Sequence, residues 1–298
     1  MILVIGNPAD PVIERVTAAL IRVGASFARI DERTARTYEI ERSVDGSSVR
    51  WRIRGGECVG QRAVGAIFVR HEPADAADRA TREALRKLGR QLDLLLLSTV
   101  CPVINRPARA TANYSKPYQL RQMAAAGFLV PRTLVTNLPS AALRFIRDLG
   151  GSVIFKGASN LKTVPQVLQL QHLERLSWLE HCPTQFQEFI AGEDFRVTVI
   201  DAESVVTRII GGEPDLSPSA ERSLSTKVLQ QCVRFTREQG LIMSGIDLRR
   251  TSAGRAYAFE LNPYPLFTYY ETEEGPRITE RVVEYLVKHQ YAASDVRV

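Results

Sequence analysis

The first hundred residues alternate between short apolar runs, which are typical of buried strands, and longer stretches with a helical spacing of apolar positions. Strands are expected at 2–6, 25–30, 49–54, 63–69 and 103–105, and helices at 11–23 and 76–97. This alternation predicts an α/β layer domain. The first turn, from Gly6 to Asp10, has one glycine where a dinucleotide-binding fingerprint needs three at fixed spacing, so a dinucleotide-binding domain is not expected.

After Pro107 the spacing of short β-like segments becomes typical of antiparallel sheets. Strands are expected at 133–135, 152–156, 164–168, 184–189, 195–200, 204–210, 244–249 and 256–262, and helices at 115–126, 140–149, 219–240 and 277–289. Gly127 ends the first of these helices, and Ser140 is the expected N-cap of the second. The chain thus predicts an α/β part followed by an α+β part, with the boundary in the loop 105–114.

Length and composition indicate a soluble globular protein of two domains or one large one, with 298 residues, 45% of them hydrophobic and 24% charged. The apolar run 92–97 is broken by Asp93 and is far shorter than the roughly 20 residues that cross a membrane. The N-terminus lacks the basic start of a signal peptide, so a cytoplasmic location is expected. The four cysteines lie far apart and form no zinc-binding pattern.

The net charge of +6 arises from 39 Lys and Arg against 33 Asp and Glu, and it favours anionic partners only as a bias. No zinc-finger pattern or aromatic-rich RNA-binding motif accompanies this charge. We interpret it as the basic surface of an enzyme. Neither a nucleic acid nor a membrane is expected as a partner, and a homo-oligomer is left open.

Three oxygen-bearing side chains fall on two neighbouring strands near the end of the chain. Glu260 and Asn262 point to the same side of an extended strand, and a hairpin brings Asp247 within reach of both. Two carboxylates and one amide oxygen suit Mg²⁺ that is held through nucleotide phosphates. The alternative is a solvated sheet face that ends in a turn at Asn262. The apolar neighbours Phe259 and Leu261 favour the magnesium site.

Two lysines stand where a phosphate could bind. Lys156 ends an apolar strand and is followed by small residues, and Lys116 begins a helix, where backbone N–H groups favour an anion. Each is also compatible with an ordinary surface lysine. The strand before Gly192 ends in the segment 187–190, which offers the apolar slot and backbone hydrogen bonds that an adenine ring needs. The alternative there is an ordinary hairpin.

Eight short segments extend these features into a longer pattern. They are VINRP at 103–107, NYSK at 113–116, GFLVPRT at 127–133, IFK at 154–156, QEFI at 187–190, DFR at 194–196, GIDL at 245–248 and FELNP at 259–263. In this order and spacing they resemble the ATP-grasp superfamily over residues 103–285. Within it they are most similar to the glutathione synthetase-like and ribosomal-protein-glutamylating (RimK-like) branches. Eight matches in sequence are far more specific than any one of them.

The resemblance implies an ATP-grasp fold of mixed α/β and α+β class. An N-terminal α/β domain, the pre-ATP-grasp domain, would cover 1–106, and the ATP-grasp domain would cover 107–298. The latter would divide into a central lid subdomain, 107–190, and a C-terminal metal-binding subdomain with an antiparallel sheet, 191–298. The resemblance assigns phosphate contacts to Lys116 and Lys156, adenine contacts to Gln187, Glu188, Phe189 and Ile190, a ribose contact to Asp194, and Mg²⁺, or alternatively Mn²⁺, to Asp247, Glu260 and Asn262.

The implied reaction is the ATP-dependent joining of a carboxylate to an amine through an acyl phosphate, with release of ADP and phosphate. The substrates would be small-molecule or peptide acids and amines. An arginine would stabilise the oxyanion of the second step. Arg196 and Arg208, on strands expected to face the cleft, are the candidates, with Arg196 preferred and Arg249 ranked below them.

Two other functions stay open at this point. One is an ATP-grasp phosphotransferase that stops at a phosphorylated product. The other is a nucleotide-binding or nucleic-acid-binding protein without catalysis, for which Asp247, Glu260 and Asn262 would be dispensable.

Three segments depart from the family pattern. The segment 157–163 has one glycine where many members have a glycine-rich flap over the phosphates. The segment 210–216 is short and acidic where relatives often have a basic residue. The segment 263–271 is rich in Pro and Tyr where the glutamylating enzymes have a glycine-containing turn. We therefore expect a substrate different from theirs.

Overall fold

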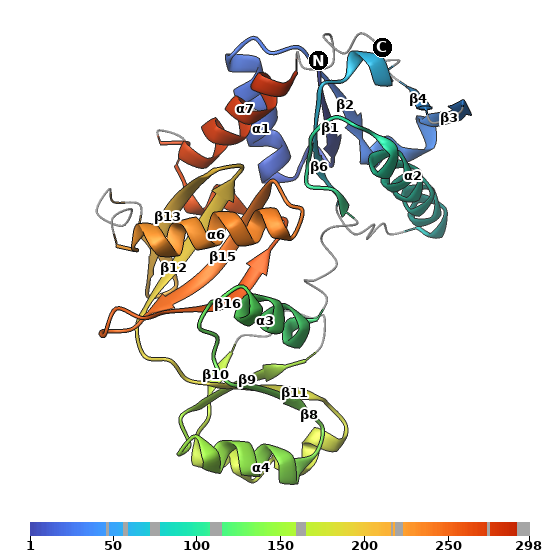
Figure 1. The fold of residues 1–298 in the computed structure, drawn as a ribbon. Helices are drawn as coiled ribbons and strands as arrows, with labels where there is room; N and C mark the ends of the chain where they lie inside the picture. Colours follow the sequence, from blue (N-terminus) through green and yellow to red (C-terminus); the bar gives the residue numbers. More distant parts are fainter. Residues whose placement is uncertain are drawn as a thin grey trace.

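The computed structural model describes residues 1–45, 48–55, 59–71, 78–107, 115–158, 165–215, 217, 223–272 and 275–290. Three groups of elements follow one another along the molecule (Figure 1): an N-terminal sheet with its helices at the top, a five-stranded sheet in the middle and a four-stranded sheet at the bottom. No helix in these ranges is long and apolar enough to cross a membrane.

The N-terminal sheet is parallel and has helices on both faces. It consists of β1 (Ile2–Gly6), β2 (Phe27–Asp31), β6 (Ala66–Arg70) and β7 (Val103–Ile104), in the order β2-β1-β6-β7. Helices α1 (Pro11–Arg22) and α7 (Arg277–His289) cover one face, and α2 (Arg79–Ser98) covers the other. Successive residues of each strand point to opposite faces, so Val4 packs under α1 and Ile5 under α2. Asp10 caps α1 by accepting the backbone N–H of Val12 at 2.8 Å.

A small antiparallel sheet completes the N-terminal part. It consists of β3 (Glu39–Asp45), β4 (Ser48–Arg54) and β5 (Val59–Gly60), beside the short 3₁₀ helices η1 (Glu32–Thr37) and η2 (Gln61–Ala63). We did not predict β3, because most of its residues are exposed and it has no alternation of apolar and polar positions. Its pairing with β4 along its whole length makes it a strand.

The four-stranded sheet, which we call the lid sheet, carries its helices on one face. It has the order β10-β9-β11-β8, from β8 (Thr133–Thr136), β9 (Val153–Gly157), β10 (Gln166–Val167) and β11 (Thr184–Glu188). Phe155 and Phe186 pack toward α4 (Pro139–Asp148), α5 (Leu170–Leu173) and η5 (Leu176–Glu180). The prediction of Ser140 as an N-cap is wrong, because α4 already begins at Pro139, whose fixed φ suits a first helical position.

The five-stranded sheet is antiparallel throughout. Its order is β14-β13-β12-β15-β16, from β12 (Glu193–Ile200), β13 (Glu203–Ile210), β14 (Glu213–Asp215), β15 (Met243–Arg250) and β16 (Ala256–Asn262). Helix α6 (Thr226–Glu238) covers one face, and α3 (Lys116–Ala125) lies against the edge strand β16. The predicted start of α6 at 219 is wrong: Ser225 caps the helix through the backbone N–H of Val228, and 218–222 lie outside the described residues.

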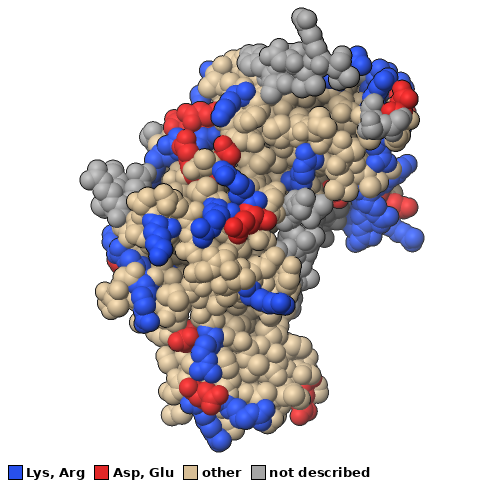
Figure 2. All heavy atoms as spheres, viewed as in Figure 1, with Lys and Arg blue, Asp and Glu red and all other residues tan. Residues whose placement is uncertain are grey.

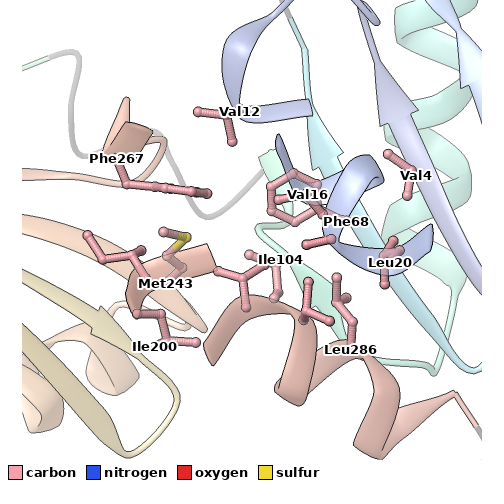
Figure 3. Packing of buried hydrophobic residues seen from close by; sticks show 14 of the residues in the cluster. Val4, Val12, Val16, Leu20, Phe68, Ile104, Ile200, Met243, Phe267 and Leu286 are labelled. Carbon is pink, nitrogen blue, oxygen red and sulfur yellow. The ribbon is translucent and has the colours of Figure 1, made fainter. Parts of the chain in front are cut away.

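The N-terminal part and the five-stranded sheet share one core. Figure 3 shows Ile200 and Met243, from one end of β12 and β15, among side chains of α1, α7 and the N-terminal sheet. The buried side chain of Asn105 adds polar contacts: it donates to the carbonyl of Met243 at 2.7 Å and accepts the N–H of the same residue at 3.0 Å. Helix α7 therefore lies within the predicted segment 191–298 but packs on the N-terminal sheet.

On the face of the molecule in Figure 2, basic and acidic side chains are interspersed. Among the described cysteines, Cys101, Cys182 and Cys232 are free thiols.

Candidate active site

The five-stranded sheet has one face under α6 and one face that carries charged residues. Its register places Arg196 opposite Asp247, and Asp247 opposite Glu260. The residues between them in sequence, such as Phe195 and Leu261, point into the core under α6. Because side chains alternate along a strand, Arg196, Asp247 and Glu260 gather on the other face, which we call the charged face.

The lid sheet contributes Lys156 from the face opposite α4. Phe155 packs under α4, so Lys156, the next residue of β9, points the other way. Burial lowers the pKa of Lys156, and the carboxylates of Glu260 and Asp247 act against that shift. These carboxylates belong to the five-stranded sheet, and the electrostatic interaction therefore places Lys156 beside the charged face.

The second predicted lysine reaches the same place from a helix. Lys116 is the first residue of α3, and its ammonium forms an ion pair with the carboxylate of Glu260. The structure thus brings together residues from positions 116 to 260, from one helix and two sheets. From their spacing in the sequence, only Asp247, Glu260 and Asn262 could be placed close together.

The charged face has the donor set that a magnesium ion requires. Burial raises the pKa of Asp247 to about 6, and the charge of Glu260 adds to the increase, while Arg196 opposes it. Two carboxylates that crowd each other in this way favour a cation between them. The amide of Asn262 follows on the same strand, and its Oδ1 accepts the N–H of Tyr264 at 2.9 Å. Oxygen donors of this kind suit Mg²⁺.

No group of three His, Cys, Asp or Glu side chains within the described ranges could hold a metal ion, so the candidate set consists of two carboxylates and an amide.

Arg196 lies across the charged face with most of its side chain buried. Its Nε is 2.8 Å from Oδ1 of Asp247, and its guanidinium lies 5.1 Å from the centre of the Tyr270 ring. A Cβ at Gly245 would come within 2.5 Å of Nη1 of Arg196, so the glycine leaves the room for this position. The buried Nη1 has no hydrogen-bond partner in the described part of the chain. It is an unpaired donor enclosed beside Gly245, and Nη2 of the same guanidinium reaches the hydroxyl of Tyr270 at 3.3 Å.

The prediction that Arg208 lies on the charged face with Arg196 is wrong. Arg208 stands opposite Phe195 in the register of β12 and β13, and it therefore points to the α6 side of the sheet. There it forms ion pairs with Asp215 at 2.8 Å and with Glu193 at 3.5 Å.

The segment predicted to hold adenine runs along the end of β11. Gln187 is buried and donates to Oγ1 of Thr133 at 2.9 Å. The carboxylate of Glu188 accepts the backbone N–H of Arg132 at 3.1 Å, and by register Glu188 lies on the face opposite Gln187. The side chain of Glu188 therefore points away from Lys156. A nucleotide beside Lys156 could contact only the backbone of Glu188.

Arg249 organises the neighbouring end of the charged face. Its guanidinium donates to both carboxylate oxygens of Asp194, at 2.6 and 2.7 Å, and to the carbonyl of Ile190 at 2.9 Å. It also lies about 6 Å from the rings of Phe189 and Phe259. Asp194, predicted to contact ribose, is thus held by Arg249.

Arg249 was ranked low only as an oxyanion donor, and the structure gives it a different contact, with Asp194. Gln119, Gly245 and Tyr270 were not predicted as site residues. The position of Gly245 within the GIDL segment was the available signal, because a glycine in a strand often marks a close approach. Tyr270 and Gln119 gave no local signal.

No family model matches the chain, and no curated protein matches it. Several solved structures do. PsnB, an ATP-grasp ligase solved with a phosphomimetic variant of its minimal precursor, Mg and ADP, superimposes with a TM-score of 0.80 at 29% identity over 97% of each chain.

Two further structures share the fold. The macrocyclase MdnC from Microcystis aeruginosa MRC, bound with the precursor peptide MdnA, has a TM-score of 0.75 at 22% identity, over 97% of this chain and 100% of that one. A RiPP-associated ATP-grasp ligase from Chryseobacterium gregarium, in complex with ADP and a leader and core peptide, has a TM-score of 0.78 at 21% identity, over 96% of each chain.

The protein therefore has the fold of the ATP-grasp ligases, and the predicted fold class is confirmed. The predicted enzyme class, an ATP-grasp ligase, is confirmed as well. The predicted placement in the ATP-grasp superfamily is supported.

Asp247 is a predicted metal ligand, and its raised pKa predicts that metal binding depends on pH. A metal ion binds the carboxylate and competes with its proton, so the affinity of the protein for Mn²⁺ should fall about tenfold per unit of pH below 6 and be level above it. Titration of Mn²⁺ between pH 5 and pH 8 measures this. The variant Asp247→Asn should bind more weakly and lose this slope, and a constant affinity of the unmodified protein over the whole range would contradict the role of Asp247.

Proposed function

We propose that this protein is an ATP-dependent carboxylate–amine ligase whose substrate is a peptide. The enzyme uses ATP and Mg²⁺ and forms an amide bond with release of ADP and phosphate. The observation that carries the peptide substrate is the match to PsnB, a ligase solved with its precursor, over nearly the whole of both chains. The assignment of individual residues is part of the proposal and rests on the geometry of the charged face.

The first step is phosphoryl transfer. An oxygen of the substrate carboxylate attacks the γ-phosphorus of ATP, the bond to the bridging oxygen of ADP breaks, and an acyl phosphate forms. This step needs positioning and charge neutralisation more than covalent help. Lys116 and Lys156 lie beside the carboxylates of the charged face and would bind the phosphate oxygens. Asp247, Glu260 and Asn262 would hold Mg²⁺, which neutralises charge on the transferring phosphoryl group.

The second step is capture by an amine. The amine nitrogen attacks the carbonyl carbon of the acyl phosphate, its proton is lost, and the C–O bond to phosphate breaks. Negative charge develops on the carbonyl oxygen in between. Arg196 carries a buried donor, Nη1, without a hydrogen-bond partner among the described residues, and it would stabilise this oxyanion.

The end of β11 and the Arg249 cluster would bind the nucleoside. The backbone of 188–190 would meet the adenine edge, with Gln187 fixing the strand and the ring of Phe189 forming an apolar wall. Asp194 would contact the ribose while Arg249 holds its carboxylate.

The test combines the protein with ATP, Mg²⁺ and peptides that contain Asp or Glu together with Lys. A ligase releases ADP only with peptide present, and the peptide loses the mass of one water for each bond. Hydroxylamine should intercept the acyl phosphate as a hydroxamate. A peptide that gains a phosphate and gives no hydroxamate would indicate the phosphotransferase instead, and the absence of peptide-dependent ADP release would contradict the proposal.

Placement in the glutathione synthetase-like and RimK-like branches stays a prediction. The segment 263–271 supports a different substrate from that of the glutamylating enzymes. In it, Tyr270 stacks on Arg196 and the hydroxyl of Tyr269 donates to Glu213 of β14 at 2.6 Å. These aromatic side chains would border the acceptor, where a small turn would leave open space.

A peptide substrate needs contacts outside the reacting groups, and the lid offers a pocket for them. A hollow of about 290 Å³ on the α4 side of the lid sheet is lined mainly by apolar side chains. Phe155 and Phe186 form its floor, and Trp178, which is 64% exposed, forms part of its rim. The ligase from Chryseobacterium gregarium holds a leader peptide as well as a core peptide. We assign this pocket to an apolar side chain of a leader segment.

Trp178→Ala is expected to raise KM for a full-length precursor about thirtyfold and to leave kcat unchanged, because a buried tryptophan contact contributes about 2 kcal/mol to a peptide interface. The same variant should treat a core peptide without leader as the unmodified protein does. Steady-state kinetics with both peptides measure this, and Leu138→Ala, another exposed apolar position of the lid, is the control. An equal increase of KM with both peptides would show that Trp178 does not bind the leader.

A further inference from the structure

The predicted metal ligands Glu260 and Asn262 stand on the edge strand of their sheet. β16 is the outermost strand. On its outer side the N–H of Ala258 donates to the carbonyl of Leu129 at 2.8 Å, and further along, at Leu261, no strand lies beside it in the described part of the chain. A buried backbone N–H or C=O group without a hydrogen bond costs free energy of folding, so such groups on an edge strand need partners other than a strand. Leu261 stands between the predicted ligands Glu260 and Asn262, and its own side chain points into the core under α6.

A glutamine side chain takes the place of the missing strand. Nε2 of Gln119 donates to the carbonyl of Leu261 at 2.8 Å, and Oε1 of Gln119 accepts the N–H of Leu261 at 3.0 Å. These are the two hydrogen bonds that a residue of a neighbouring strand would make. Gln119 is only 2% exposed, so water does not compete for them.

The same helix carries one of the phosphate lysines. Gln119 follows Lys116 by three residues in α3, and residues at this spacing share one side of a helix. Lys116 forms its ion pair with Glu260, the residue before Leu261. The contact between Gln119 and Leu261 therefore sets the distance of α3 from β16 at the site itself.

We propose that Gln119 is the positioning residue of the metal site: its amide fixes the backbone between Glu260 and Asn262, and so orients both ligands and the lysine opposite them. The proposal rests on the metal assignment made above. An amide is required because it carries a donor and an acceptor side by side. Methionine has a similar length and offers neither, and glutamate retains an acceptor but loses the donor.

Binding of Mn²⁺ in the presence of ADP tests this without any turnover. The signal of free Mn²⁺ in electron paramagnetic resonance gives the dissociation constant at 10 °C, and circular dichroism melting shows that each variant is folded at that temperature. Gln119→Met should weaken Mn²⁺ binding about tenfold or more, the usual effect of losing a group that orients a ligand. Gln119→Glu should lie between it and the unmodified protein.

Gln122→Met is the matched control, since it is the same substitution one turn further along α3, where Nε2 contacts Tyr118 instead of β16. It should leave Mn²⁺ binding unchanged.

Folded Gln119 variants that bind Mn²⁺ as the unmodified protein does would overturn the proposal and leave the metal site standing. A general structural role would lower the melting temperature without this change in affinity. If Gln119→Met does not fold, Gln119→Glu decides the question alone. Failure of the unmodified protein to bind Mn²⁺ would overturn the metal assignment and this proposal with it.

Discussion

Glu260→Gln is expected to lower ATP-dependent turnover about a thousandfold, which corresponds to about 4 kcal/mol of the activation free energy. The substitution keeps the shape of the side chain and removes its charge. Glu260 faces Asp247 in the sheet and pairs with Lys116, so the change removes one proposed metal ligand and the partner of a phosphate-binding lysine. Phosphoryl transfer depends on neutralising charge, and it should suffer more than nucleotide binding.

The rate of ADP release with a peptide substrate measures this effect. Circular dichroism melting should show a folded protein, because Glu260 is partly exposed and lies outside the apolar core. Glu238→Gln is the matched control, since Glu238 is an exposed residue of α6 that pairs only loosely with Arg234 at 3.8 Å. Turnover within a few fold of the unmodified protein in Glu260→Gln would remove Glu260 from the metal site.

Arg196→Met is expected to slow amide formation by about 10² to 10³, the usual effect of removing one donor from an oxyanion. Arg196 holds its guanidinium between Asp247 and Tyr270, and Nη1 has no hydrogen-bond partner in the described part of the chain. If its role belongs to the second step, acyl phosphate should still form. Hydroxamate formation with hydroxylamine should then be reduced much less than amide formation.

Arg208→Met provides the control for Arg196→Met, and it tests the orientation that the register of β12 and β13 defines. Arg208 lies on the α6 side, where its ion pairs with Asp215 and Glu193 are partly exposed. Its loss should change stability by no more than about 1 kcal/mol and leave amide formation near that of the unmodified protein. Equal losses in the two variants would contradict the assignment of the oxyanion donor to Arg196.

Local patterns predicted much of the secondary structure near the site. The predicted bounds of β16 and α7 agree with the structure, and β15 extends the predicted strand by one residue at each end. These elements have strong patterns: alternating polar and apolar positions in the strands, and a clear apolar stripe in α7. The pairing of Asp247 with Glu260 followed from them, because two strands joined by a short turn pair with each other.

The errors arose where a local pattern was ambiguous. The side to which Arg208 points depends on the register of a hairpin, and a shift of one residue reverses every side chain. Most residues of strand β3 are polar and exposed, and its pairing with β4 makes it a strand. The start of α6 depended on which of several serines caps the helix, and Ser225 does so.

By itself the sequence determined the alternation of strands and helices and the ligand-bearing hairpin, because periodicity, turns and residue types act over a few neighbouring positions. The type of chemistry followed from the resemblance of eight of its segments to the ATP-grasp superfamily. Only the tertiary structure decided which distant residues meet: Lys156 of the lid sheet beside Glu260, Arg196 over Gly245, and Gln119 in place of a strand beside Leu261. These contacts depend on how sheets and helices pack through their cores. Packing is a collective property of side chains far apart in the chain, and no local pattern records it.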